Sequence, residues 1–172
     1  RFAALFTELG VGRGVCVSSM VRNQVDVVAA YYGALKIGAA FGGVNVMYRG
    51  SDIGYQLTHS RPAVVLTDAE FAPLVDEVLP EGMRRLTYGD ELDARLNDQP
   101  TAEPVADVDE NDVALVVYTS GTEATPKGVL IPHRNYLAST APAWGWGLGT
   151  NPEDTWLFVM PFHTIAGIGS MT

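Results

Sequence analysis

"DVALVVYTSGTEATPKGVLIPH" (residues 112–133) joins two apolar runs through a loop that is rich in hydroxyl groups. Residues 112–120 predict a buried strand that leads straight into the loop, and residues 128–133 predict a second strand. The loop between them carries a glycine near each end and a single lysine, Lys127. Such a loop is either a cradle for phosphate or a sharply bent polar hairpin. The rest of the chain has to decide between these two interpretations.

Strand and helix patterns alternate before and after this loop, which favours βαβ units and an α/β fold with a mostly parallel sheet flanked by helices. Strands are predicted at residues 14–20, 39–46, 63–67, 84–88 and 155–161.

Helices are predicted between these strands, each with its own boundary signal. The first follows the helical spacing from Val25 to Leu35, with Gly38 where a C-cap glycine would lie. Ser51 is expected to cap a helix through His59, and Asp68 one that runs toward Leu79. A further helix is expected over residues 135–146.

The charge of the chain is uneven. Net charge is −9, from 11 Lys and Arg against 20 Asp and Glu, and residues 97–112 hold six acids without a Lys or Arg. Because no basic stripe offsets this acidity, nucleic acid is excluded as a partner class. We expect a first α/β block over 1–96, an acidic surface connection over 97–112, and a second, truncated block over 113–172 that carries the loop.

Cysteine content and hydropathy exclude further classes of protein. Cys16 is the single cysteine of the 172 residues, so no internal disulfide is possible, and its apolar surroundings predict a buried, inert thiol. The apolar run from Val27 to Leu35 is far too short for a membrane span, and no signal peptide is visible. We therefore expect a cytoplasmic protein without a transmembrane segment. The chain begins at Arg1 and stops without a closing helix signal, so both ends look cut.

The loop has the groups that a phosphate cradle needs. Four hydroxyls lie within seven residues, at Thr119, Ser120, Thr122 and Thr125. Glycines allow the backbone to approach a phosphate, and Lys127 adds a mobile positive charge. The Walker pattern does not fit, because a proline precedes the lysine and a glycine follows it.

The full string 118–129 resembles the phosphate-loop motif of the adenylate-forming superfamily, [YF]-T-S-G-T-T-G-x-P-K-G. Two positions depart from it: Glu123 stands where Thr is usual, and Ala124 where Gly is usual. Glu123 either points outward or helps to hold Mg²⁺. The matching positions are Thr119, Ser120, Gly121, Thr122, Pro126, Lys127 and Gly128.

Other segments resemble the same superfamily in the same order. Residues 12–23 are similar to its early strand motif, and residues 34–68 to the segment that follows. "MPFHTIAG" (160–167) is similar to the motif beside the acyl pocket. The resemblance implies that Phe162, His163 and Gly167 contact the substrate.

The resemblance further implies a fragment of an acyl- or aryl-CoA synthetase that uses ATP, Mg²⁺ and coenzyme A. Residues 119–128, including Thr125, would bind the nucleotide and Lys127 would act in catalysis, with no metal ligand assigned. Peptide-synthetase adenylation domains usually have Phe-Asp where this chain has Phe162 and His163, so an amino acid substrate is disfavoured. The later motifs and the C-terminal domain would be the missing partner, and these 172 residues alone are expected to be inactive.

Several alternatives stay open. The chain could be a non-catalytic nucleotide-binding module, an adenylate-forming enzyme with another acceptor, or an unrelated α/β domain whose hairpin imitates the motif. Outside the motifs, His133 is expected to have a structural role beside a helix start, and His59 to be solvated. Trp144 and Trp146 are expected to pack rather than to bind a cofactor.

Overall fold

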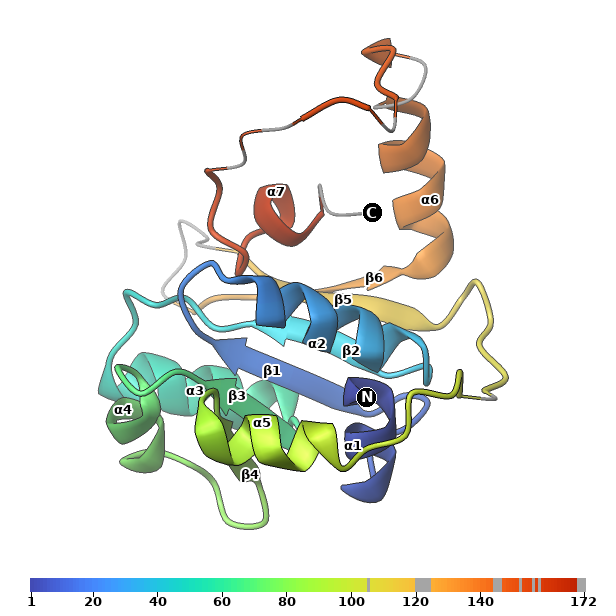
Figure 1. The fold of residues 1–172 in the computed structure, drawn as a ribbon. Coiled ribbons are helices and arrows are strands. Elements are labelled where there is room, and N and C mark those ends of the chain that lie inside the picture. The colour runs from blue at the N-terminus through green and yellow to red at the C-terminus, as the bar shows by residue number, and fades with distance from the viewer. Residues whose placement is uncertain are drawn as a thin grey trace.

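The computed structural model describes residues 1–104, 106–119, 125–143, 147–151, 153–155, 157 and 159–169. Within this part of the chain, a sheet with helices on both faces has the strand order β4-β3-β1-β2-β5-β6 (Figure 1). The strands are β1 (Cys16–Met20), β2 (Ala40–Gly43), β3 (Val64–Thr67), β4 (Arg84–Thr87), β5 (Val113–Tyr118) and β6 (Gly128–Pro132).

The helices connect these strands or follow them. They are α1 (Phe2–Glu8), α2 (Val25–Leu35), α3 (Gly50–Ser60), α4 (Ala72–Asp76), α5 (Asp90–Asn97), α6 (His133–Pro142) and α7 (Ile165–Ile168). Strands β1 to β5 pair in parallel, and only β6 runs antiparallel, against β5. The predicted α/β class with a mostly parallel sheet is therefore confirmed.

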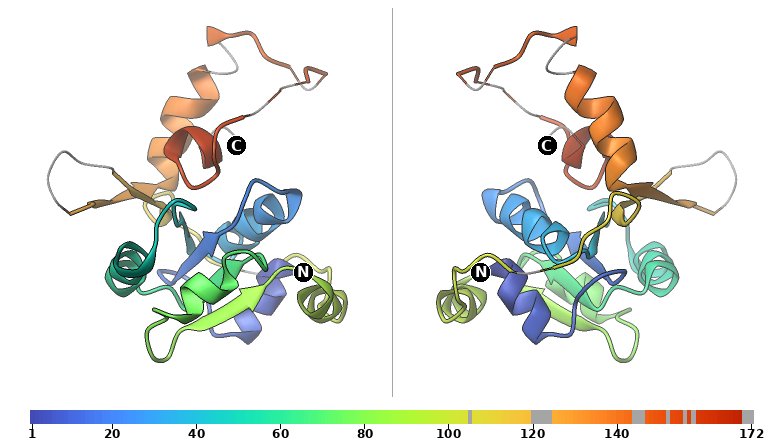
Figure 2. Two further views of the ribbon diagram at one scale, coloured as in Figure 1. Left: turned by 90° about the vertical axis from the view of Figure 1, so that its left-hand side faces the viewer. Right: turned by 90° about the vertical axis from the view of Figure 1, so that its right-hand side faces the viewer.

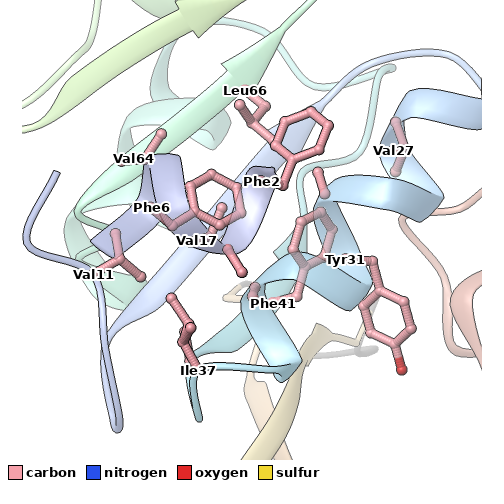
Figure 3. Close-up of a cluster of buried hydrophobic side chains, with 14 of the residues drawn as sticks. Phe2, Phe6, Val11, Val17, Val27, Tyr31, Ile37, Phe41, Val64 and Leu66 are labelled. Atoms are coloured by element: carbon pink, nitrogen blue, oxygen red, sulfur yellow. The ribbon is translucent and has the colours of Figure 1, made fainter. Parts of the chain in front are cut away.

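The two larger apolar cores lie on opposite faces of the sheet. Along β3, Val64 and Leu66 point into one core while Val65 points into the other, as the alternation of a strand requires. Helices α1, α2 and α5 cover the first face, where Phe2, Phe6, Tyr31 and Phe41 lie in the core (Figure 3). Helices α3 and α4 cover the second face through Ile53, Leu57, Phe71 and Val75. Figure 2 shows the helices on either side of the sheet from two further directions.

Some sequence-based boundaries were wrong. Helix α3 begins at Gly50, and Ser51 lies inside its first turn without capping it. Asp68 accepts hydrogen bonds from the N–H groups of Glu70 and Phe71, but the helix that follows ends at Asp76 rather than near Leu79. Helix α5 has a strongly acidic first turn and was not predicted.

The expected strand at 155–161 was also wrong, because its described residues (155, 157 and 159–161) lie in neither a helix nor a strand. Helix α6 starts two residues earlier than expected, at His133. The proposed division at 97–112 remains a prediction. One sheet includes strands from both sides of it, since β5 pairs with β2.

Candidate functional site

The hydroxyl-rich loop leaves the sheet at the carboxyl end of β5 and returns through β6. Tyr118 and Gly128 are opposite each other as the last described pair of the hairpin. Beyond them, the N–H of Thr119 donates to the carbonyl of Lys127 at 3.0 Å. This bond brings Thr119 and Lys127 side by side at the base of the loop, and both residues are exposed. A lysine and a threonine therefore lie next to each other on the exposed surface at this edge of the sheet.

The structure describes only part of the predicted loop. Thr125, Pro126, Lys127 and Gly128 are described, together with Thr119. The remaining predicted contacts lie outside the described residues and stay predictions, namely Ser120, Gly121, Thr122, Glu123 and Ala124. Trp144 and Trp146 lie outside them as well.

The second predicted motif forms a tight turn before α7. Thr164 is the N-cap of this helix, and its hydroxyl accepts from the N–H of Gly167 at 3.0 Å. The same hydroxyl donates to the carbonyl of Pro161 at 2.8 Å. This pair of bonds fixes the backbone around Phe162 and His163, both of which are half-buried.

Asn23 holds this turn from the other side, a contact that the sequence did not predict. Its amide nitrogen donates to the carbonyl of Met160 at 2.9 Å, and its oxygen accepts from the N–H of Phe162 at 2.9 Å. Asn23 lies just after β1, so one side chain joins the carboxyl end of a central strand to a segment that is 137 residues further along the chain. The pocket motif is thereby fixed to the sheet.

His163 lies at the carboxyl end of β2. A methyl group added at Gly43 would lie 2.7 Å from the Cβ of His163, so the turn touches the strand directly. Burial lowers the pKa of the His163 imidazole, which keeps the side chain neutral near pH 7. Because β2 and β5 are parallel neighbours, their carboxyl ends reach the same edge. Both predicted motifs therefore lie at this edge, where ligands of open α/β sheets bind.

His59 is exposed, as expected, but it also makes a contact that the sequence did not predict. Its Nδ1 lies 2.8 Å from the hydroxyl of Tyr118, directly before the loop. His133 opens α6, and its backbone N–H donates to the carbonyl of Asp112 at 3.1 Å. The structural role expected for its side chain remains a prediction.

Within the described part of the chain, no group of three or more His, Cys, Asp or Glu side chains could hold a metal ion. Among the same residues, no helix has both the length and the apolar character needed to cross a bilayer.

The fold and the site together define a class of α/β domain. Its sheet has a hydroxyl-rich loop with one lysine at the carboxyl edge, and a turn with a half-buried histidine lies at the same edge. Comparison with known proteins agrees with this class. The family model described as "AMP-binding enzyme" matches residues 1–172. The chain belongs to this family.

Individual relatives carry ligase and synthase names. The chain is 30% identical, over 98% of its length, to the long-chain-fatty-acid–CoA ligase FadD13 of Mycobacterium tuberculosis. It is 34% identical, over 94% of its length, to tyrocidine synthase 3 of Brevibacillus parabrevis. It covers 34% of the first of these proteins and 2% of the second.

A solved structure shows the same fold. The N-terminal domain of FACL13 from Mycobacterium tuberculosis superposes with a TM-score of 0.91 at 27% identity, and the match covers 99% of this chain and 44% of that one. The chain thus spans about a third of the length of the CoA ligase that it resembles and less than half of this domain.

Proposed function

We propose that the protein containing this chain activates a fatty or aryl carboxylic acid with ATP and transfers the acyl group to coenzyme A. The observation that carries this proposal is the meeting of the Lys127 loop and the His163 turn at one edge of the sheet. Membership of the AMP-binding family supports it. We also propose the cytoplasm as its location, because ATP and CoA are its co-substrates.

The chemistry has two steps. A carboxylate oxygen attacks the α-phosphorus of ATP, the bond to the bridging oxygen breaks, and pyrophosphate leaves with the electron pair. The CoA thiolate then attacks the acyl carbon and AMP leaves. In this proposal Thr119, Thr125 and Lys127 bind the β- and γ-phosphates as negative charge moves onto them. Gly128 and Pro126 set the backbone on either side of the lysine, and loop residues 120–124 would add further donors.

Mg²⁺ is the cofactor that the resemblance implies beside ATP. The described site residues supply hydroxyls and an ammonium group, which suit nucleotide phosphates, and among described residues no cluster of metal-ligating side chains occurs. They do not by themselves fit a resident metal ion, and no step is assigned to one.

The substrate class follows from the pocket motif. Phe162 and His163 would border the acyl group, with Gly167 in the helix turn behind them. A neutral, half-buried His163 offers no negative charge to a substrate ammonium. The motif therefore favours an acid without an α-amino group, in agreement with the name of FadD13.

ATP–pyrophosphate exchange by the whole protein tests the proposal, with fatty, aryl and amino acids as separate panels. Exchange with fatty or aryl acids, followed by acyl-CoA formation when CoA is added, is the expected result. Exchange without acyl-CoA would point to another acceptor. Nucleotide binding without exchange would show a non-catalytic module, and amino acids as the sole substrates would overturn the substrate class. Residues 1–172 alone are expected to form no acyl-CoA.

A further inference from the structure

Helix α3 contacts both ends of the loop that carries Lys127. Tyr55 donates from its hydroxyl to the carbonyl of Pro126 at 3.0 Å, directly before the lysine. One turn later on the same helix, His59 Nδ1 lies 2.8 Å from the hydroxyl of Tyr118, directly before Thr119. Residues four apart share a face of a helix, so a single face reaches both strands of the hairpin.

The three rings also pack on one another. Tyr55 and His59 are stacked with centroids 5.6 Å apart, and His59 meets Tyr118 edge-on at 5.8 Å. Partial burial raises the pKa of Tyr118, so its hydroxyl stays protonated near neutral pH.

Gly128 leaves room for this arrangement. A Cβ at this position would lie 3.3 Å from Cζ of Tyr118 and 3.5 Å from Cε1 of His59. The first distance is tight and the second is ordinary van der Waals contact, so a side chain here would press on the Tyr118 ring. The last glycine of the loop motif thus leaves room for the Tyr118 ring, which is bonded to α3 through His59.

The helix itself is firmly held. Ile53 and Leu57 are fully buried in the core beneath it. Gln56 is also buried, and its amide donates to the carbonyl of Gly43 at 2.8 Å. Gly43 is the residue that touches His163, so α3 is fixed to the strand end that supports the pocket motif.

We propose that Tyr55 and His59 are positioning residues that hold Thr119 and Lys127 in the geometry that binds the polyphosphate of ATP. The inference rests on the proposed function, because it assigns a role in phosphate binding to residues outside the loop. Neither residue touches the reacting atoms. Tyr55 acts through the backbone of Pro126, which precedes Lys127. His59 acts through the ring of Tyr118, which precedes Thr119.

Three variants of the whole protein test this, namely Tyr55→Phe, His59→Ala and His59→Asn. Tyr55→Phe removes one hydroxyl and keeps the ring, and His59→Asn keeps a polar nitrogen near the position of Nδ1. Thr58→Ala is the matched control, since Thr58 is exposed on the same helix and lies between the two positions. Affinity for inorganic pyrophosphate and for a non-hydrolysable ATP analogue is measured by calorimetry, beside exchange kinetics and thermal melting.

Tyr55→Phe and His59→Ala are each expected to weaken pyrophosphate and analogue binding roughly three- to tenfold, the size expected for one lost hydrogen bond. The KM for the acid should stay within about twofold, because the pocket motif is untouched. His59→Asn should recover part of the loss, and Thr58→Ala should resemble the wild type. A double-mutant cycle of His59→Ala with Tyr118→Phe should be non-additive, since both remove one bond.

Failures of the two proposals are distinguishable. If the wild type binds pyrophosphate but shows no exchange with any acid, the proposed function is wrong while the positioning role still stands on the binding data. If the variants melt earlier yet bind and exchange like the wild type, α3 only stabilises the hairpin and the inference is overturned. A wild type that neither binds nor exchanges would overturn both.

Discussion

His163 lies so close to Gly43 that no side chain fits between them. A Cβ on residue 43 would be 2.7 Å from Cβ of His163 and closer still to its Cα. The glycine at the end of β2 therefore sets the depth at which the pocket turn sits against the sheet. This contact joins the first half of the chain to its last described turn.

Gly43→Ala should displace the His163 turn and impair use of the acid. We expect kcat/KM for the acid to fall roughly tenfold or more, because small misplacements at a reacting centre are costly. The KM for ATP should change much less. Steady-state kinetics with Gly12→Ala as control checks this, since a Cβ on Gly12 meets nothing within 4 Å. Equal effects of the two variants would contradict the assignment.

Asn23→Ala should loosen the same turn from its other side. It removes the bonds to Met160 and Phe162, each of which is worth about 1 kcal/mol. The KM for the acid should therefore rise roughly five- to thirtyfold, with a small loss of melting temperature. Asn23→Asp keeps the acceptor and loses the donor, so an intermediate effect is expected. An unchanged KM in both variants would show that Asn23 does not position the pocket.

Lys127→Ala should be the most damaging single change in the described part of the loop. If the lysine follows the departing pyrophosphate, kcat for exchange should fall about 100-fold or more. Lys127→Arg should retain part of the activity. Lys36→Ala is a suitable control, because Lys36 is an exposed lysine paired with Glu103 on another face. Similar rates for both alanine variants would rule out a catalytic role for Lys127.

His163 should make stability depend on pH. Burial depresses its pKa in the folded state, so the unfolded chain binds more protons once the pH falls through the usual value near 6.5. The contribution of neutral His163 to the free energy of unfolding is therefore fully present above about pH 7. It is lost as the pH decreases toward the pKa of His163 in the folded state. Thermal melting between pH 5 and 8 should show a shallower dependence for His163→Gln than for the wild type. Parallel curves would contradict the assigned burial.

Cys16 should resist thiol reagents in the folded protein. It lies in the sheet, and burial raises its pKa to about 11. A disulfide reagent at pH 8 should label it slowly in buffer and within seconds in denaturant. Rapid labelling in buffer would mean that β1 opens readily.

The buried strands were predictable because continuous apolar runs are typical of strands that are buried on both faces. Apolar runs such as 14–20 and 112–120 lie in a sheet covered on both faces, and they became β1 and β5. These local signals predicted the fold class that the structure confirmed. The phosphate-loop composition suggested anion binding, but the loop and pocket motifs were recognised by their resemblance to the adenylate-forming superfamily, and their contacts remain predictions.

Other features depend on partners far away in sequence. The run at 155–161 is apolar enough for a strand, yet its described residues join no strand, and Leu157 is 91% exposed. The sequence missed the contact of His59 with Tyr118, because Tyr118 lies 59 residues further along the chain and nothing local reveals it. Asn23 was equally inconspicuous for the same reason. Local pattern cannot report such contacts.

The attachment of the loop to α3 bears on any attempt to transplant it. "YTSGTEATPKGV" looks like a portable cassette, but two of its positions take their support from "YQLTH" at residues 55–59. A graft into a foreign hairpin would carry the hydroxyls and the lysine without their scaffold. The smallest transferable unit is the hairpin together with this helix, and protein engineers would have to move both.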